Sequence, residues 1–171
     1  MEVRSVEAVV KALNEAKVQY LIVGGLAVNA HGYERFTNDV DLVIGLERDN
    51  ITRGLRALIA IGYQMKIPVT PEQFANPVLR EAWRREKDMT VLPLWSDVHR
   101  RTPVDVFVYE PFDFSQEYNL ARREPVAGTD TAPVIRLETL LKMKRGAARP
   151  QDLADIADLE RLQELKKEFP K

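Results

Sequence analysis

The chain contains no cysteine in its 171 residues. This absence excludes disulfides, thiol catalysis and zinc sites built from thiolates. The sequence also lacks an apolar run long enough to cross a bilayer, and residues 1–7 do not begin the apolar segment of a signal peptide. We therefore expect a cytoplasmic protein that has no membrane partner.

Net charge is also nearly absent, because 25 lysines and arginines balance 26 aspartates and glutamates, for a formal net charge of −1. This balance removes any global electrostatic argument for binding nucleic acid. A local basic patch is an open alternative, formed by Arg84, Arg85, Lys87, Arg100 and Arg101. Trp83 and Trp95 lie in the same segment, where they either stack on bases or pack locally beside prolines.

The composition suits one folded domain. An apolar share of 45% and a charged share of 30% are those of a globular protein, and the length suffices for one well-buried core. We expect a single domain over residues 1–171, with a core of about residues 1–128 and a helical C-terminal part of about residues 129–171.

Hydrophobic periodicity predicts helices that alternate with strands. Strands are expected at residues 20–23, 40–44, 63–67, 89–94, 104–109, 124–126 and 133–135, the last two around a turn at Gly128. Helices are expected from Ser5, as N-cap, and at residues 25–31, 49–61, 78–87, 136–146 and 150–168, with Gly32 and Gly62 ending two of them. This order indicates an α/β (α+β) fold, a small mixed β-sheet with helices packed mainly on one face.

Asp39 and Asp41 lie at the start of the apolar run of residues 40–44. Residues i and i+2 of a strand project to the same face, so the two carboxylates point together while the residues between them enter the core. Carboxylates held side by side repel each other unless a cation lies between them, and all-oxygen ligands favour Mg²⁺ or a similar hard ion. Upstream, Gly24 and Gly25 allow a backbone to approach a bulky anion closely. Together these features predict nucleotide chemistry.

Asp105 is the best candidate for a third carboxylate, because it lies between Val104 and Val106 near the start of another predicted strand. With Asp39 and Asp41 it would hold one or two Mg²⁺ ions, or Mn²⁺ instead, about 3.5–4 Å apart in the two-ion case. Such ions lower the pKa of an acceptor hydroxyl and neutralise the triphosphate as pyrophosphate leaves. The protein then mainly positions the reactants.

Residues 21–44 resemble the core signature of the DNA polymerase β-type nucleotidyltransferase superfamily, and most of all its AbiEii-like toxins and their minimal relatives. The motifs that carry the resemblance are Gly24-Gly25, His31-Gly32, Arg35-Phe36-Thr37, Asp39-Val40-Asp41, Val104-Asp105-Val106 and a C-terminal motif with Lys144, Arg149, Asp152 and Asp155. The resemblance extends over about residues 4–162. It implies transfer of a nucleotide from an NTP, with ATP binding among the expected properties, to a hydroxyl with Mg²⁺. It also implies a C-terminal cluster that closes over the nucleotide.

Several of these residues have a structural alternative. Gly24 and Gly25 either bind the triphosphate, beside the free N–H groups of the helix that follows, or only close a strand-to-helix turn. Arg35 either pairs with the two aspartates or contacts phosphate or the acceptor, and Thr37 would order the loop. His31 is expected to be a structural residue at a helix end.

Lys144 and Asp152 flank the joint between the two predicted C-terminal helices. A lysine in the last turn of one helix and an aspartate in the first turn of the next are stabilised by the helix dipoles without any ligand. The alternative is that Lys144 contacts phosphate or ribose and that Asp152 belongs to the nucleotide site. Asp155, at i+3 from Asp152, can share a face with it within reach of Lys144.

The sequence therefore predicts a Mg²⁺-dependent nucleotidyltransferase that moves a nucleoside monophosphate from an NTP to a hydroxyl and releases pyrophosphate. Its acceptor would be an RNA 3′ end such as that of tRNA, a protein side chain, or a small molecule such as an antibiotic. The chain could also be the toxin of a toxin–antitoxin pair, neutralised by a cognate antitoxin. The alternative is a catalytically silent module that binds nucleotide or a partner, and the intact Asp39, Asp41 and Asp105 argue against it.

Overall fold

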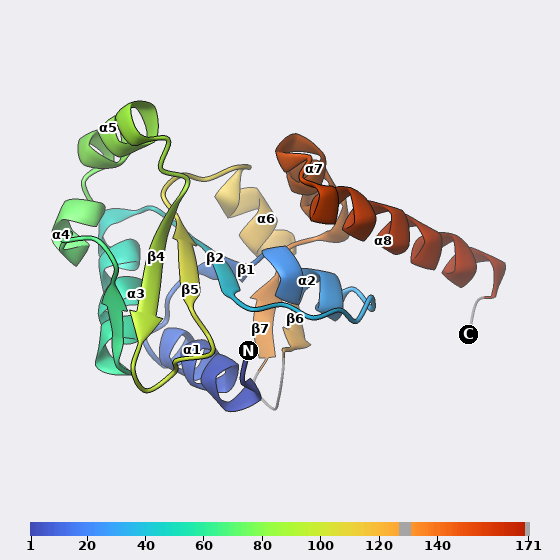
Figure 1. The fold of residues 1–171 in the computed structure, drawn as a ribbon, viewed down its shortest axis with the longest axis horizontal. Helices are drawn as coiled ribbons and strands as arrows, with labels where there is room; N and C mark the ends of the chain where they lie inside the picture. The colour runs from blue at the N-terminus through green and yellow to red at the C-terminus, as the bar shows by residue number, and fades with distance from the viewer. Residues whose placement is uncertain (127–130, 170–171) are drawn as a thin grey trace.

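A computed structural model of the chain describes residues 1–126 and 131–169. Seven strands form one sheet in the order β3-β4-β5-β2-β1-β7-β6 (Figure 1). The strands are β1 (Tyr20–Ile22), β2 (Val40–Ile44), β3 (Tyr63–Met65), β4 (Val91–Ser96), β5 (Val104–Phe107), β6 (Arg122–Pro125) and β7 (Thr131–Val134). The sheet is mixed, because β2–β5 and β1–β7 are parallel pairs and the other neighbours are antiparallel.

Helices connect most of these strands. They are α1 (Val3–Glu15), α2 (Gly24–Ala30), α3 (Arg48–Ala60), α4 (Pro71–Phe74), α5 (Pro77–Lys87), α6 (Phe114–Leu120), α7 (Leu137–Ala147) and α8 (Pro150–Glu168). Among the described residues, none of the helices has both the length and the apolarity needed to cross a membrane.

Helices α1 and α3 cover one face of the sheet. They pack against each other, and α3 also packs on β2 and β3. Strand residues that point to this side, such as Val40 and Leu42, are fully buried. The buried Asn50 of α3 fixes the helix to the strand ends, because its amide donates to the carbonyl oxygens of Gln19 (2.9 Å) and Gly45 (2.8 Å). This side of the sheet is the main core.

The opposite face is covered unevenly. Helix α2 packs beside β2, and α7 and α8 pack against each other near β7 (Figure 1). Along β4 the burial alternates, with Leu92 and Leu94 buried, Val91 and Pro93 partly exposed, and Trp95 exposed. The β3–β4–β5 half of this face therefore remains accessible.

The fold class predicted from the sequence is confirmed, and most predicted elements lie where they were expected. Gly32 and Gly62, with φ of +101° and +98°, follow the ends of α2 and α3 as predicted. The sheet continues past residue 128, because β7 pairs with β1. The predicted turn at Gly128 itself lies outside the described residues.

One prediction of local structure is wrong, and two short helices were missed. The N-cap of α1 is Glu2, not Ser5, and the helix begins at Val3. Ser5 is buried, and its hydroxyl lies 3.0 Å from Nδ1 of His99. The short helices α4 and α6 were not predicted. They depend on side-chain caps, from Thr70 in α4 and Asp113 in α6, more than on periodicity.

Candidate metal and nucleotide site

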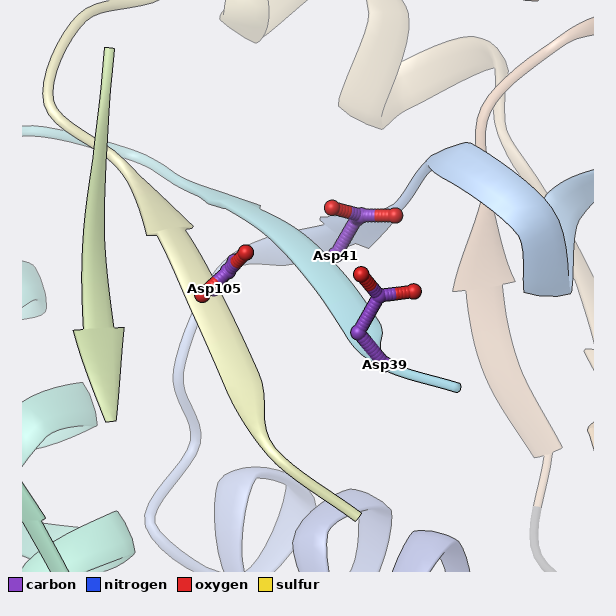
Figure 2. A group of neighbouring side chains, drawn as sticks. All are labelled: Asp39, Asp41 and Asp105. Carbon is purple, nitrogen blue, oxygen red and sulfur yellow. The ribbon is translucent and has the colours of Figure 1, made fainter. Parts of the chain in front are cut away.

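Three carboxylates, Asp39, Asp41 and Asp105, gather on one face of the sheet, and we call them the carboxylate triad (Figure 2). Asp39 directly precedes β2, Asp41 lies within β2, and Asp105 lies within β5. Each contributes an oxygen that lies within 4.8 Å of the other two, and all three side chains are partly buried. The predicted clustering of these residues is confirmed.

Strand pairing explains how the triad forms. Strands β2 and β5 run parallel, with Asp41 directly opposite Asp105. On either side of these two residues, Val40, Leu42, Val104 and Val106 are fully buried on the face that α1 and α3 cover. Because side chains alternate along a strand, burial of the valines and leucine forces both aspartates to the other face.

The electrostatics of the triad show an excess of negative charge. Burial raises the pKa of Asp41 to about 7, and repulsion from Asp39 and Asp105 adds to the effect. Burial also raises the pKa of Asp105, with a further contribution from Asp39, whereas the charge of Lys66 lowers it. Within residues 1–126 and 131–169, no lysine or arginine forms an ion pair with the triad. Three converging carboxylate oxygens fit a hard divalent cation such as Mg²⁺.

Gly24 is required by the position of Asp41. Its φ is +62°, which L side chains rarely adopt, and a Cβ added there would lie 1.8 Å from Oδ2 of Asp41. The N–H of Val23 also donates to the carbonyl oxygen of Asp41 (3.0 Å), so the turn is held against β2. The strand-to-helix turn that was one sequence alternative is therefore real, and it lies against the triad.

Gly25 makes room for Thr37 in the same way. A Cβ on Gly25 would lie 2.3 Å from Oγ1 of Thr37. Thr37 is buried, and its hydroxyl donates to Oδ1 of Asp39 at 3.3 Å. The predicted role of Thr37 in ordering the loop is consistent with this contact. Triphosphate binding by the two glycines stays a prediction.

Arg35 does not pair with the aspartates of the triad, so that sequence alternative is wrong. Its Nη2 donates to Oδ2 of Asp155 on α8 (2.9 Å), and its Nη1 donates to the carbonyl oxygen of Phe36 (2.8 Å). The backbone of Arg35 is held by Asn29 of α2, which accepts from its N–H (3.1 Å) and donates to its carbonyl oxygen (3.0 Å). The loop that leads to Asp39 is thus attached to both α2 and α8.

Lys144 is the centre of a second charged group, the Lys144 cluster, which comprises Lys144, Asp152, Asp155, Arg35 and Arg149. Nζ of Lys144 donates to Oδ1 of Asp152 (3.1 Å) and to Oδ2 of Asp155 (2.6 Å). The lysine lies in the last turn of α7, as the sequence predicted, and is only 5% exposed. The prediction that Asp152 and Asp155 share a face within reach of Lys144 is confirmed.

The carboxylates of the Lys144 cluster are well compensated. Burial alone would raise the pKa of Asp152, but hydrogen bonds from Arg149 and Lys144 outweigh it and lower that pKa. Burial would likewise raise the pKa of Asp155, and hydrogen bonds from Lys144, Gln151 and Arg35 lower it instead. These acids are charged in the folded protein because their cations are built into the chain.

Arg149 lies between the two groups. Its Nε donates to Oδ2 of Asp152 (2.7 Å), while its side chain is 74% exposed. Its positive charge, followed by that of Lys144, opposes the rise in the pKa of Asp41. The Lys144 cluster is therefore close enough to the triad to act on it electrostatically.

The remaining candidates have structural surroundings. His31 is at the C-terminal end of α2, where Nε2 lies 2.8 Å from the carbonyl oxygen of Ile135, in line with the structural role predicted for it. Trp83 stacks on Phe74 with ring centroids 6.2 Å apart. Trp95 lies in β4 and is 37% exposed.

Two of the basic residues of segment 84–101, Arg84 and Arg100, have partners within the chain. The guanidinium of Arg84 lies over the ring of Tyr109, 4.3 Å from its centroid, just beyond the end of β5. Arg100 pairs with Asp97 (3.5 Å) in the loop that precedes β5. The two residues therefore lie near opposite ends of β5, and the alternative of a local nucleic-acid patch stays open.

Two residues near the site were not among the predicted site residues. Asp155 binds Arg35 across 120 positions of sequence, and only the lysine–arginine–aspartate spacing of the C-terminal motif pointed toward it. Lys66 acts on Asp105 from beyond the end of β3, and no local pattern could have identified it.

A search of solved structures finds a similar fold in the lincomycin-bound crystal structure of the lincosamide antibiotic adenylyltransferase LnuA. The TM-score is 0.57 and the sequence identity 17%, over 92% of this chain and 95% of that chain. At this identity the likeness shows a shared fold. A scan against models of known protein families gives no match, and a search of curated protein sequences gives none either. The expected closeness to AbiEii-like proteins stays a prediction.

Proposed function

We propose that this chain is a nucleotidyltransferase that depends on a divalent metal ion and moves a nucleoside monophosphate from an NTP to a hydroxyl. The observation that carries the proposal is the carboxylate triad, whose three acids converge without an ion pair to any described lysine or arginine. A buried group of like charges is costly unless it binds a cation, so such groups are frequent at functional sites. The fold shared with an adenylyltransferase supports the same reaction class.

The residues have distinct roles in this proposal. Asp39, Asp41 and Asp105 would hold one or two divalent ions, Mg²⁺ or Mn²⁺. A bound ion would neutralise the triphosphate and lower the pKa of the acceptor hydroxyl. Asp105 accepts the proton of that hydroxyl, whose oxygen attacks the α-phosphorus as the bond to the pyrophosphate group breaks.

The nucleotide would lie between the Gly24-Gly25 turn and the Lys144 cluster. The turn already adjoins Asp41 and Thr37, so a triphosphate beside it would be next to the triad. Arg35, Lys144 and Asp152 already have hydrogen-bond partners inside the Lys144 cluster. We assign these three residues the role of holding this side of the site in place. Arg149 pairs with Asp152, but its side chain is 74% exposed, so it is the cation of the cluster that an incoming phosphate could contact.

The proposed acceptor is a small molecule. The structural neighbour is an antibiotic adenylyltransferase with lincomycin bound, and this favours a small molecule over an RNA 3′ end or a protein side chain. The roles of toxin and antitoxin partner stay predictions from the resemblance, since no contact in the structure bears on them.

The test is transfer of label from each α-³²P-labelled NTP, with Mg²⁺, to lincomycin, total RNA or total protein. We expect wild-type protein to label one acceptor class and to release pyrophosphate, and we expect Asp41→Asn to do neither while it stays folded. Asp49→Asn is the matched control, because Asp49 is exposed on α3 at the covered face of the sheet. Full activity of a folded Asp41→Asn variant would overturn the proposal.

A further inference from the structure

A row of side chains crosses the open half of the sheet beside the triad. Pro93 of β4 is directly opposite Asp105, which is directly opposite Asp41. Lys66 extends the row beyond β4, because its N–H donates to the carbonyl oxygen of Pro93 (3.0 Å). Directly opposed residues of neighbouring strands share a face, so Pro93 lies on the same side as the triad.

A second row begins with Trp95. It is two residues from Pro93 and therefore projects to the same face, opposite Gln64 of β3. Diagonal neighbours across paired strands are about 7–8 Å apart, so Trp95 and Asp105 are separated by about the width of one ring. Leu92 and Leu94, which flank Pro93 in β4, are fully buried on the other face.

We propose that Pro93, Trp95 and Lys66 form the acceptor subsite of the proposed transferase. The subsite takes a small ring compound that lays an apolar face on Trp95 and Pro93 and directs a hydroxyl to Asp105. This inference rests on the proposed function and names the acceptor class of the same site.

Exposure supports a binding role for Trp95. The two tryptophans of the chain differ in surroundings, since Trp83 stacks on Phe74 whereas Trp95 is 37% exposed in a strand whose alternate residues are buried. An aromatic face is rigid and apolar, so it binds a flat or ring-shaped ligand at little entropic cost. Pro93 extends this apolar surface to the edge of Asp105 without adding an N–H donor.

The charges beside this surface favour a small acceptor over RNA. Lys66 is exposed at the end of the Pro93 row, and its charge reaches Asp105. It can donate a hydrogen bond to a second polar group of the acceptor. RNA would require a track of several cations for its phosphates, whereas small-molecule sites combine an apolar surface with a few polar groups. The surface beside the triad is of the second kind, an apolar area with a few polar groups.

The test measures the fluorescence emission of Trp95 as ligands are added. In Trp83→Phe, emission reports Trp95 alone, and calorimetry on the unmodified chain makes the result independent of that substitution. Both proteins are titrated, with Mn²⁺ present, with lincomycin, methyl glucoside, adenosine and a short RNA. We expect a saturable change in emission with at least one ring compound, and affinity that is about tenfold or more weaker in Trp95→Ala and largely restored in Trp95→Phe.

Two results would overturn the subsite: a response to the RNA alone, or no response to any probe. Mn²⁺ binding, followed by electron paramagnetic resonance, separates this failure from failure of the proposed function. If the wild-type chain binds Mn²⁺ but Trp95 does not respond, the acceptor subsite fails and the metal site stands. If Mn²⁺ does not bind, the proposed function fails first.

Discussion

Two groups of acids lie near each other in this molecule, and their electrostatics are opposite. In the carboxylate triad the pKa values of Asp41 and Asp105 are raised. In the Lys144 cluster the pKa values of Asp152 and Asp155 are lowered, although these side chains are almost fully buried. Burial acts in the same direction on all four, so the difference comes from their partners.

The comparison separates acids with a structural role from acids for which we propose a functional one. Asp152 and Asp155 receive hydrogen bonds from Lys144, and these fix α7 to α8 without any ligand. Strand register places Asp41 beside Asp105, and Asp39 accepts a hydrogen bond from Thr37, but no described lysine or arginine pairs with the three, and we propose that a cation from solution does so. Each prediction below alters one side of this balance.

The largest effect is expected when the cation of the Lys144 cluster is removed. Lys144→Met leaves Asp152 and Asp155 buried without their shared partner, and loss of one member of a buried ion pair costs about 3–5 kcal/mol of stability. Urea unfolding measures the loss. Lys142→Met, at an exposed position on the same helix, is the control and should change stability by less than about 0.5 kcal/mol.

A loss below about 1 kcal/mol in Lys144→Met would show that the two carboxylates find other partners. Titration of NTP into the folded fraction then tests whether Lys144 contributes to nucleotide binding. Unchanged affinity for NTP would show that Lys144 has only a structural role, whereas weaker NTP binding would support a contact between Lys144 and the nucleotide.

The second-largest effect is a pH dependence of stability that arises from the triad in the metal-free protein. The pKa of Asp41 is about 7 in the folded protein against 3.8 in the unfolded chain, so the folded state binds this proton more tightly. The associated stability is present at pH below 3.8 and is lost as pH rises through about 7, by at most about 4 kcal/mol. Asp41→Asn should be more stable than wild type at pH 8 and show a flatter profile. Asp49→Asn should keep the wild-type slope, and an identical slope in Asp41→Asn would refute the assignment.

The third effect is compensation of the triad by metal. At pH 8, Mg²⁺ or Mn²⁺ at a hundred times its dissociation constant should stabilise wild type by about 2.7 kcal/mol. The same addition should give little or no stabilisation in Asp41→Asn. Thermal unfolding with and without EDTA measures both. Equal stabilisation of the two proteins would place the metal elsewhere.

The smallest effect is expected at Arg149. Arg149→Ala removes an exposed partner of Asp152, which keeps its bond to Lys144, so stability should fall by about 1 kcal/mol or less. The same change removes a charge that opposes the rise in the pKa of Asp41, so that pKa should move further up. Carboxyl NMR titration follows it. A downward shift would contradict the inferred proximity of Arg149 to the triad.

Local patterns predicted much of this fold because the relevant forces are local. Residues 39–42 alternate half-buried and buried side chains, so Asp39 and Asp41 could be assigned to one face from their spacing. Asp105 could be added because Val104 and Val106 show the same alternation. The site prediction succeeded where two strands repeat one pattern.

The predictions that were wrong concern residues whose partners are far away in the sequence. Ser5 has the chemistry of an N-cap, but its hydroxyl is beside His99, 94 positions away. Arg35 carries a charge that suits Asp39 by sequence distance, yet its partner Asp155 is on a helix made much later in the chain. Capping in α4 was readable in the Thr70–Gln73 spacing, whereas its four residues are too short for periodicity.

The contact between Arg35 and Asp155 also sets an order of events during synthesis. The two residues are 120 positions apart, so the loop that carries Asp39 is free on its α8 side until residue 155 has left the ribosome. Contacts between such distant segments form late and slowly, because long chain closure must precede them. The growing chain can thus assemble its sheet and triad before the Lys144 cluster is complete.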